Sequence, residues 1–150
     1  MESMTDAFLH LYRRELIQLK QEITAYETES NLWRTDRTIN NSGGALCVHL
    51  IGNLNHFVGV GLGQTGYVRD REFEFSGQPV PRTELLPQID ATQKMMEQVI
   101  STLSDEDLSR DFSMNIRQNT VTIAFALTHL YGHLNYHVGQ INYHRRLLDA

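Results

Sequence analysis

The C-terminal stretch TVTIAFALTHLYGHLNYHVGQINYHRRLL, residues 120–148, decides the fold. Alternate steps of four and three residues link one set of positions in it: Ile123, Leu127, Leu130, Leu134, His137, Ile141, His144 and Leu148. This spacing is typical of the buried seam of a helix in a bundle. We therefore predict a helix that begins near Thr120 and runs almost to the C-terminus. Its seam places His137 at a core position and His133 at the edge of the same face.

The rest of the chain shows the same helical period, with apolar residues recurring at three- to five-residue steps. We predict further helices over residues 5–28, over residues 44–62, and from about residue 83, with Pro87 in the first turn of the last of these. A long charged loop, residues 67–77, separates the second and third helices. Residues 110–117 alternate polar and apolar side chains, which predicts a short strand or extended connector. The sequence thus predicts one all-α domain, residues 1–150, folded as a four-helix bundle.

Composition excludes several classes of function. The chain has 150 residues, 41% of them hydrophobic, which is enough for one domain with a core. A formal charge of −5 and the absence of a Lys/Arg cluster argue against nucleic-acid binding. The most apolar stretch, residues 45–62, contains histidine, asparagine and glycine, which argues against a membrane span. No secretory signal is visible, and a single cysteine, Cys47, suits the reducing cytoplasm. We expect a cytoplasmic protein that forms a homodimer, the default assembly of small soluble chains.

Histidine spacing indicates a metal site. His129, His133 and His137 lie four residues apart, so that neighbours in this series stand one turn apart on a helix and can bind one ion together. The pair could be His129 with His133, or His133 with His137. In the second predicted helix, His49 and His56 are seven residues apart, too far to share an ion easily. Either could supply a third ligand from a facing helix and leave a position open for water or substrate.

Two stretches resemble a known superfamily. The string His133-Leu134-Asn135-Tyr136-His137-Val138-Gly139-Gln140-Ile141, followed by Arg145 or Arg146, resembles the last-helix signature of the DinB-like, or YfiT-like, metal-binding four-helix bundles. The run His49-Leu50-Ile51-Gly52-Asn53-Leu54, which follows Asn41-Ser42-Gly43-Gly44, is similar to the first-ligand region of an uncharacterised subgroup. That subgroup also tends to carry a charged loop like Arg69-Asp70-Arg71-Glu72-Phe73. The resemblance spans most of the chain.

The resemblance implies that His49, His133 and His137 hold one divalent ion, commonly zinc or nickel, and that water completes its shell. His129, His56 and His144 would then lie behind the ligands or at the surface. Gln140, one turn after His137, could orient a ligand or a bound water. Arg69, Arg71 and Glu72 could cap the mouth of the site, although solvent-exposed ion pairs are the commoner fate of such charges. Cys47 is expected to be a packed small residue.

Three functional readings follow from such a site. Characterised relatives in the superfamily include transferases and isomerases that depend on low-molecular-weight thiols such as bacillithiol or mycothiol, so the resemblance favours a metal-dependent thiol S-transferase acting on a small molecule. The alternative is a metal-dependent hydrolase, which would need a loop carboxylate such as Glu72 as its base, because no acidic residue lies within a turn of His133 or His137. A third reading is a non-enzymatic, stress-associated metal-binding or dimeric bundle. The catalytic residues and the substrate are not legible in the sequence.

Overall fold

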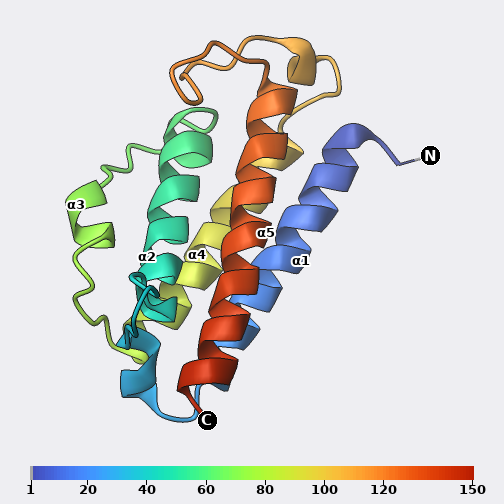
Figure 1. The fold of residues 1–150 in the computed structure, drawn as a ribbon. Coiled ribbons are helices and arrows are strands. Elements are labelled where there is room, and N and C mark those ends of the chain that lie inside the picture. Colours follow the sequence, from blue (N-terminus) through green and yellow to red (C-terminus); the bar gives the residue numbers. More distant parts are fainter. Residues whose placement is uncertain (1) are drawn as a thin grey trace.

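Four long helices form the body of the molecule (Figure 1). The computed structural model describes residues 2–150, and no β-strand occurs in that range. The long helices are α1 (Met4–Ala25), α2 (Gly43–Leu54), α4 (Arg82–Ser101) and α5 (Ile123–Leu148). Both α1 and α2 pack mainly against α4 and α5, so α1 and α2 stand on opposite corners of the bundle. The predicted all-α four-helix bundle is confirmed.

The seam predicted for α5 faces the core of the bundle. All its aliphatic members are buried, and so is His144. His137 is the exception, because it is only half-buried. Opposite this seam, α1 buries a matching stripe made of Phe8, Tyr12, Leu16, Leu19 and Ile23. The burial of these two stripes supplies much of the apolar area that stabilises the fold.

Several helix ends differ from the predicted positions. Helix α1 ends at Ala25 instead of residue 28, and α2 continues as the π-helix η2 (Asn55–Val60). Helix α5 begins at Ile123, after a Thr122 cap whose side chain accepts from the Phe125 N–H. Pro87 lies in the second turn of α4, one turn later than predicted. Because Pro87 has no N–H, the carbonyl of Thr83 loses its hydrogen-bond partner within the helix. Both residues are exposed, so water can bond to that carbonyl instead.

Short elements occupy the connections. The 3-10 helix η1 (Glu29–Trp33) follows α1, and the one-turn helix α3 (Arg71–Glu74) lies within the predicted long loop between α2 and α4. In Figure 1, α3 lies outside the bundle, on the α2 side. Before α5, the 3-10 helix η3 (Asp107–Ser109) leads into a connector that is extended, as predicted, and is held by two isolated β-bridges, Asp111 with Thr122 and Ile116 with Asn119. None of the helices in residues 2–150 combines the length and apolar character that a membrane crossing requires.

Candidate metal centre

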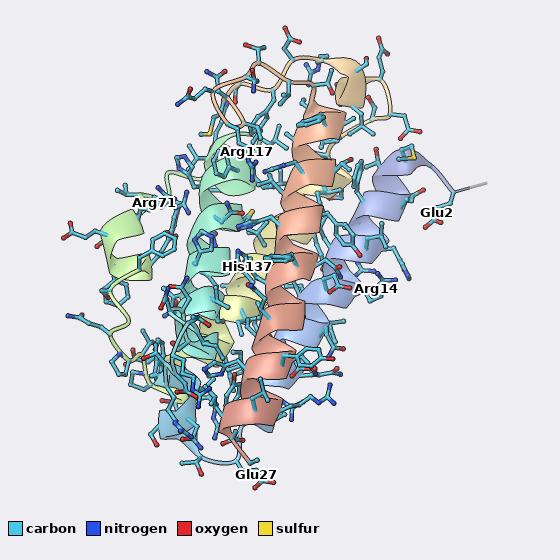
Figure 2. All side chains as sticks on the ribbon, in the orientation of Figure 1. Glu2, Arg14, Glu27, Arg71, Arg117 and His137 are labelled. Carbon is cyan, nitrogen blue, oxygen red and sulfur yellow. The ribbon has the colours of Figure 1, made fainter. Side chains whose placement is uncertain are left out.

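Three histidines meet between α2 and α5. His49 is buried on α2, and His133 and His137 stand one turn apart on α5 (Figure 2, where His137 is labelled). The Nε2 atom of His133 lies 3.1 Å from Nε2 of His49 and 3.1 Å from Nε2 of His137. One ligand atom from each of the three lies within 4.8 Å of the others. The fold therefore brings together the three residues that the family resemblance implied as ligands.

The far side of two of these rings is held by an oxygen acceptor. Nδ1 of His49 lies 3.0 Å from Oε1 of Glu74, and Nδ1 of His137 lies 2.7 Å from Oε1 of Gln140. A carboxylate oxygen and an amide oxygen only accept hydrogen bonds, so each Nδ1 carries the proton. The Nε2 lone pairs of His49 and His137 are consequently free and face the centre, which is the arrangement that oriented metal-binding histidines show.

The donor set fits a divalent ion. With Zn–N bonds of about 2.0 to 2.1 Å, nitrogens in a tetrahedral zinc site stand about 3.4 Å apart. The 3.1 Å between Nε2 of His133 and Nε2 of each of its two neighbours is close to this value. The ring proton of neutral His133 can lie on Nε2, where it can be donated to only one of the two neighbouring nitrogens, Nε2 of His49 or Nε2 of His137, or it can lie on Nδ1. Within residues 2–150, two buried atoms at this cavity have no hydrogen-bond partner, namely Nδ1 of His133 and Oδ1 of Asn53. An ion bound to Nε2 of His133 would place the proton of that ring on Nδ1.

Burial keeps His49 and His133 in their neutral, ligand-competent form. Burial, together with the neighbouring His137 and His49, lowers the pKa of His133 to about 3. Burial also lowers the pKa of His49, although its hydrogen bond to Glu74 acts in the opposite direction. Protons and metal ions compete for the same lone pairs. At neutral pH these two rings are therefore available to a metal.

A cavity of about 490 Å³ opens beside the histidines. Its wall includes all three of them, together with Arg69, Arg71, Arg117 and His129 and several apolar and amide side chains. Figure 2 labels Arg71 and Arg117, which reach this region from α3 and from the connector before α5. Within residues 2–150, no aspartate or glutamate lines this cavity. The site is therefore open on one side and positively charged.

Helix α3 is anchored to the site by a buried ion pair. Glu74 is 3% exposed, and both its oxygens accept from Arg69: Nε lies 2.8 Å from Oε2, and Nη2 lies 2.8 Å from Oε1. The carboxylate rests on Gly52 of α2, where an added β-carbon would overlap it. Phe75, the next residue, tilts its ring against the His49 imidazole with the ring centres 4.9 Å apart. Glu74 thus links the loop to the ligand histidine.

A family model described as "Protein of unknown function (DUF1572)" matches residues 3–150. The chain belongs to this family. No curated protein sequence matches this DUF1572 chain significantly. Its fold is similar to that of a conserved protein from Enterococcus faecalis, with a TM-score of 0.76 and 17% sequence identity over 99% of this chain and 98% of the other. It is also similar to that of YfiT from Bacillus subtilis, with a TM-score of 0.74 and 17% identity over 98% of this chain and 89% of YfiT. YfiT is described as "a probable metal-dependent hydrolase with an unusual four-helix bundle topology". The predicted resemblance of this DUF1572 protein to the DinB-like, YfiT-like bundles is confirmed at the level of the fold.

The remaining histidines of the DUF1572 protein lie outside the cluster. His129 lines the cavity one turn before His133, stacked on Phe125. His56 is half-buried on η2 with its ring against Phe57. His144 is not at the surface: Nδ1 lies 2.7 Å from the Tyr26 hydroxyl, and Nε2 lies 2.8 Å from the Arg34 carbonyl. It belongs to the buried hydrogen bonding at the C-terminal end of α5.

The loop residues were predicted less well. Arg69 and Arg71 line the cavity as expected, but Glu72 is exposed and absent from its wall. The carboxylate at the site is Glu74, which the sequence did not single out, because nothing local distinguishes it from Glu72. Gln140 does orient a ligand candidate, His137, as the sequence had allowed. Cys47 is fully buried, consistent with a packed small residue.

Replacement of Gly52 with alanine is expected to destabilise the DUF1572 protein by about 1 to 3 kcal/mol, because the new methyl group overlaps the Glu74 carboxylate. Displacing Glu74 should also weaken metal binding by His49. Gly139→Ala is the matched control. Its β-carbon lies on the exposed side of α5 and meets no atom of residues 2–150 within 4 Å, so the variant should be more stable by about 0.5 to 1 kcal/mol. Urea unfolding of the two variants measures the difference, and equal effects would contradict this packing of Gly52.

Acid is expected to destabilise the metal-free protein through His133. Its pKa is about 3 in the folded chain and near 6.5 when unfolded, so below pH 6.5 the unfolded chain binds more protons. The free energy of unfolding therefore falls as the pH drops below that value. Melting temperatures in the presence of a chelator, taken between about pH 7 and pH 5, should fall more steeply for wild type than for His133→Gln. Parallel curves would show that His133 does not carry this dependence.

Proposed function

We propose that this protein binds one divalent metal ion through Nε2 of His49, His133 and His137 and uses it to activate a small thiol for transfer to an electrophilic substrate. The observation that carries the proposal is the convergence of three Nε2 atoms on the wall of an open, positively charged cavity. Three imidazoles with a free position are typical of catalytic zinc sites, and nickel accepts the same donors. When bound, such an ion acts as a Lewis acid that lowers the pKa of a thiol or water beside it.

The lack of a free carboxylate favours a thiol over water. Glu74 is committed to Arg69 and His49 through both of its oxygens. No acidic side chain in residues 2–150 lines the cavity. A free thiol has a pKa of about 8.5, whereas that of water is about 15.7, so the thiol needs far less help to lose its proton. A cavity without a carboxylate base is therefore better suited to thiol chemistry.

The protein's own residues would divide the remaining work. Glu74 and Gln140 hold the imidazoles of His49 and His137 so that their lone pairs face inward. The arginines that line the cavity, Arg71 and Arg117 above all, attract an anionic nucleophile and stabilise its charge. In the reaction the sulfur forms a bond to carbon, the bond from that carbon to its leaving group breaks, and the thiol proton goes to solvent or to His129, which lines the same cavity.

Metal-dependent hydrolysis is the second candidate. The likeness of the fold to YfiT, a probable metal-dependent hydrolase, favours it. His129 is half-buried on the cavity wall and is the residue placed to accept a proton from water. A hydrolase of this kind should lose ester hydrolysis in His129→Gln while keeping its metal.

Cobalt-substituted protein offers a direct test of the thiol proposal. Addition of cysteine should produce a sulfur-to-cobalt charge-transfer absorption that serine does not, and the band should be missing in His137→Gln. The same protein should couple cysteine to 1-chloro-2,4-dinitrobenzene, forming a C–S bond and releasing chloride and a proton. Hydrolysis of 4-nitrophenyl acetate with no absorption change on adding thiol would favour the hydrolase. The absence of both activities would favour a non-enzymatic metal-binding bundle.

A further inference from the structure

A second cavity, of about 380 Å³, lies on the other side of His137. Residues 38–41, the loop before α2, form one wall, and α5 forms the other through Gln140, Tyr143 and Leu147. It shares three lining residues with the first cavity, namely Asn41, Leu46 and His137. The two spaces therefore adjoin at the edge of the histidine cluster, and His137 faces both.

The two cavities differ in charge. We call the first the cationic cavity, after Arg69, Arg71 and Arg117, and the second the neutral cavity. Within residues 2–150, no Arg, Lys, Asp or Glu lines the neutral cavity. Arg146 packs over the Tyr143 ring at 5.0 Å from its centre but does not line the space.

The lining of the neutral cavity suits an uncharged molecule of mixed character. Thr38, Asn40 and Gln140 offer hydroxyl and amide groups, and Ile39, Tyr143 and Leu147 offer apolar surface. Tyr143 and Leu147 are both 63% exposed, so their apolar surfaces are available to a ligand in this space. Apolar walls with a few polar groups are the usual composition of small-molecule sites, and the volume falls in their ordinary range.

We propose that the two cavities are two subsites of one site that are occupied at the same time. The cationic cavity takes the anionic group of one small molecule, and the neutral cavity takes an uncharged, partly apolar second molecule. The inference rests on the proposed function, because transfer requires two reactants beside the same ion, whereas hydrolysis requires one reactant and water. It identifies Arg71 and Arg117 as determinants for the first molecule, and Tyr143 for the second.

Two simple probes test this division on ¹⁵N-labelled, zinc-loaded protein. Inorganic phosphate represents the anion, and benzamide represents the uncharged amphipathic molecule. In ¹H–¹⁵N correlation spectra, phosphate should shift the amides of Arg71, Arg117 and His129, whereas benzamide should shift those of Thr38, Asn40 and Tyr143. With one probe at saturation, the dissociation constant of the other should change by less than about twofold.

Variants on each side supply the controls. The double variant Arg71→Gln, Arg117→Gln should weaken phosphate by about tenfold and leave benzamide unchanged. Tyr143→Ala should weaken benzamide several-fold and leave phosphate unchanged. All three side chains are exposed, so the variants should fold normally. Repeating the titrations on metal-free protein separates phosphate held by the arginines from phosphate held by zinc alone.

Competition between the probes, or shifts in the same set of amides, would overturn the proposal of two subsites. A phosphate response that the arginine variants do not alter would overturn the assignment of the cationic cavity. Failure of benzamide to shift the amide resonances of the neutral cavity would overturn the assignment of that cavity to an uncharged molecule. The proposed function would fail by a different result, namely the absence of metal binding or of a thiol-dependent absorption. A protein with one undivided cavity could still show both, so the two failures can be told apart.

Discussion

The His137→Ala variant is expected to lose its bound divalent ion and remain folded. Wild-type protein purified without a nickel column should carry about one equivalent of metal if three histidines hold the ion. Loss of a residue that only orients a metal ligand typically lowers metal affinity by about 10- to 100-fold. Removing one of the three ligands themselves should lower it further. His137 is half-buried, so its truncation leaves a smaller cavity than loss of a core residue would.

Elemental mass spectrometry measures the metal content, and circular dichroism checks that the variant is folded. His129→Ala is the matched control, because His129 lines the same cavity from the same helix but its nitrogens are not part of the cluster. It should retain the metal. Equal loss in the two variants would show that the ligand assignment is wrong, and a metal-free wild type that binds neither added zinc nor nickel would leave no metal function to explain.

The Glu74→Ala variant is expected to lose about 3 to 5 kcal/mol of folding free energy, because it leaves the Arg69 guanidinium largely buried without its partner. The side chain of Arg69 is 13% exposed and that of Glu74 is 3% exposed, so solvent cannot replace the lost contacts. The His49 ring also loses the acceptor that orients it. Zinc affinity should fall by about 10- to 100-fold in protein that is still folded.

Glu72→Ala controls for the loss of a loop carboxylate. Glu72 belongs to the same one-turn helix but is exposed, so its removal should change stability by less than about 0.5 kcal/mol. Glu74→Gln separates the two roles, because an amide oxygen can still accept from His49 Nδ1 while the ion pair with Arg69 is lost. Urea unfolding and zinc titration measure both quantities. Similar behaviour of Glu72→Ala and Glu74→Ala would contradict the anchoring role of Glu74.

The sequence predicted those parts of the site that lie on a single helix. A spacing of four residues puts His133 and His137 on one face wherever the helix packs, since that geometry belongs to the backbone. The same reasoning placed Gln140 beside His137 and identified the apolar seam that faces the core. It left open whether His129 or His137 pairs with His133, because both lie one turn away.

Sequence spacing could not place residues from different segments against one another. His49 and His56 are equivalent by pattern, but only His49 stands at the level where α2 passes His133. The choice between Glu72 and Glu74 likewise depends on how the long loop folds back onto Gly52. The family resemblance implied His49 but was silent on Glu74 and on the two cavities.

By itself, then, the sequence determined the four long helices, the buried face of α5 and the spacing of His129, His133 and His137 one turn apart, because periodicity along one helix is a local property of the backbone. Tertiary structure alone decided the meeting of His49 with the last two of these histidines, the anchoring by Glu74 and Arg69, and the different charge of the cavities on either side of His137. These features depend on the register between helices and on the path of a long loop. Both are set by the packing of the whole core rather than by any one stretch of chain.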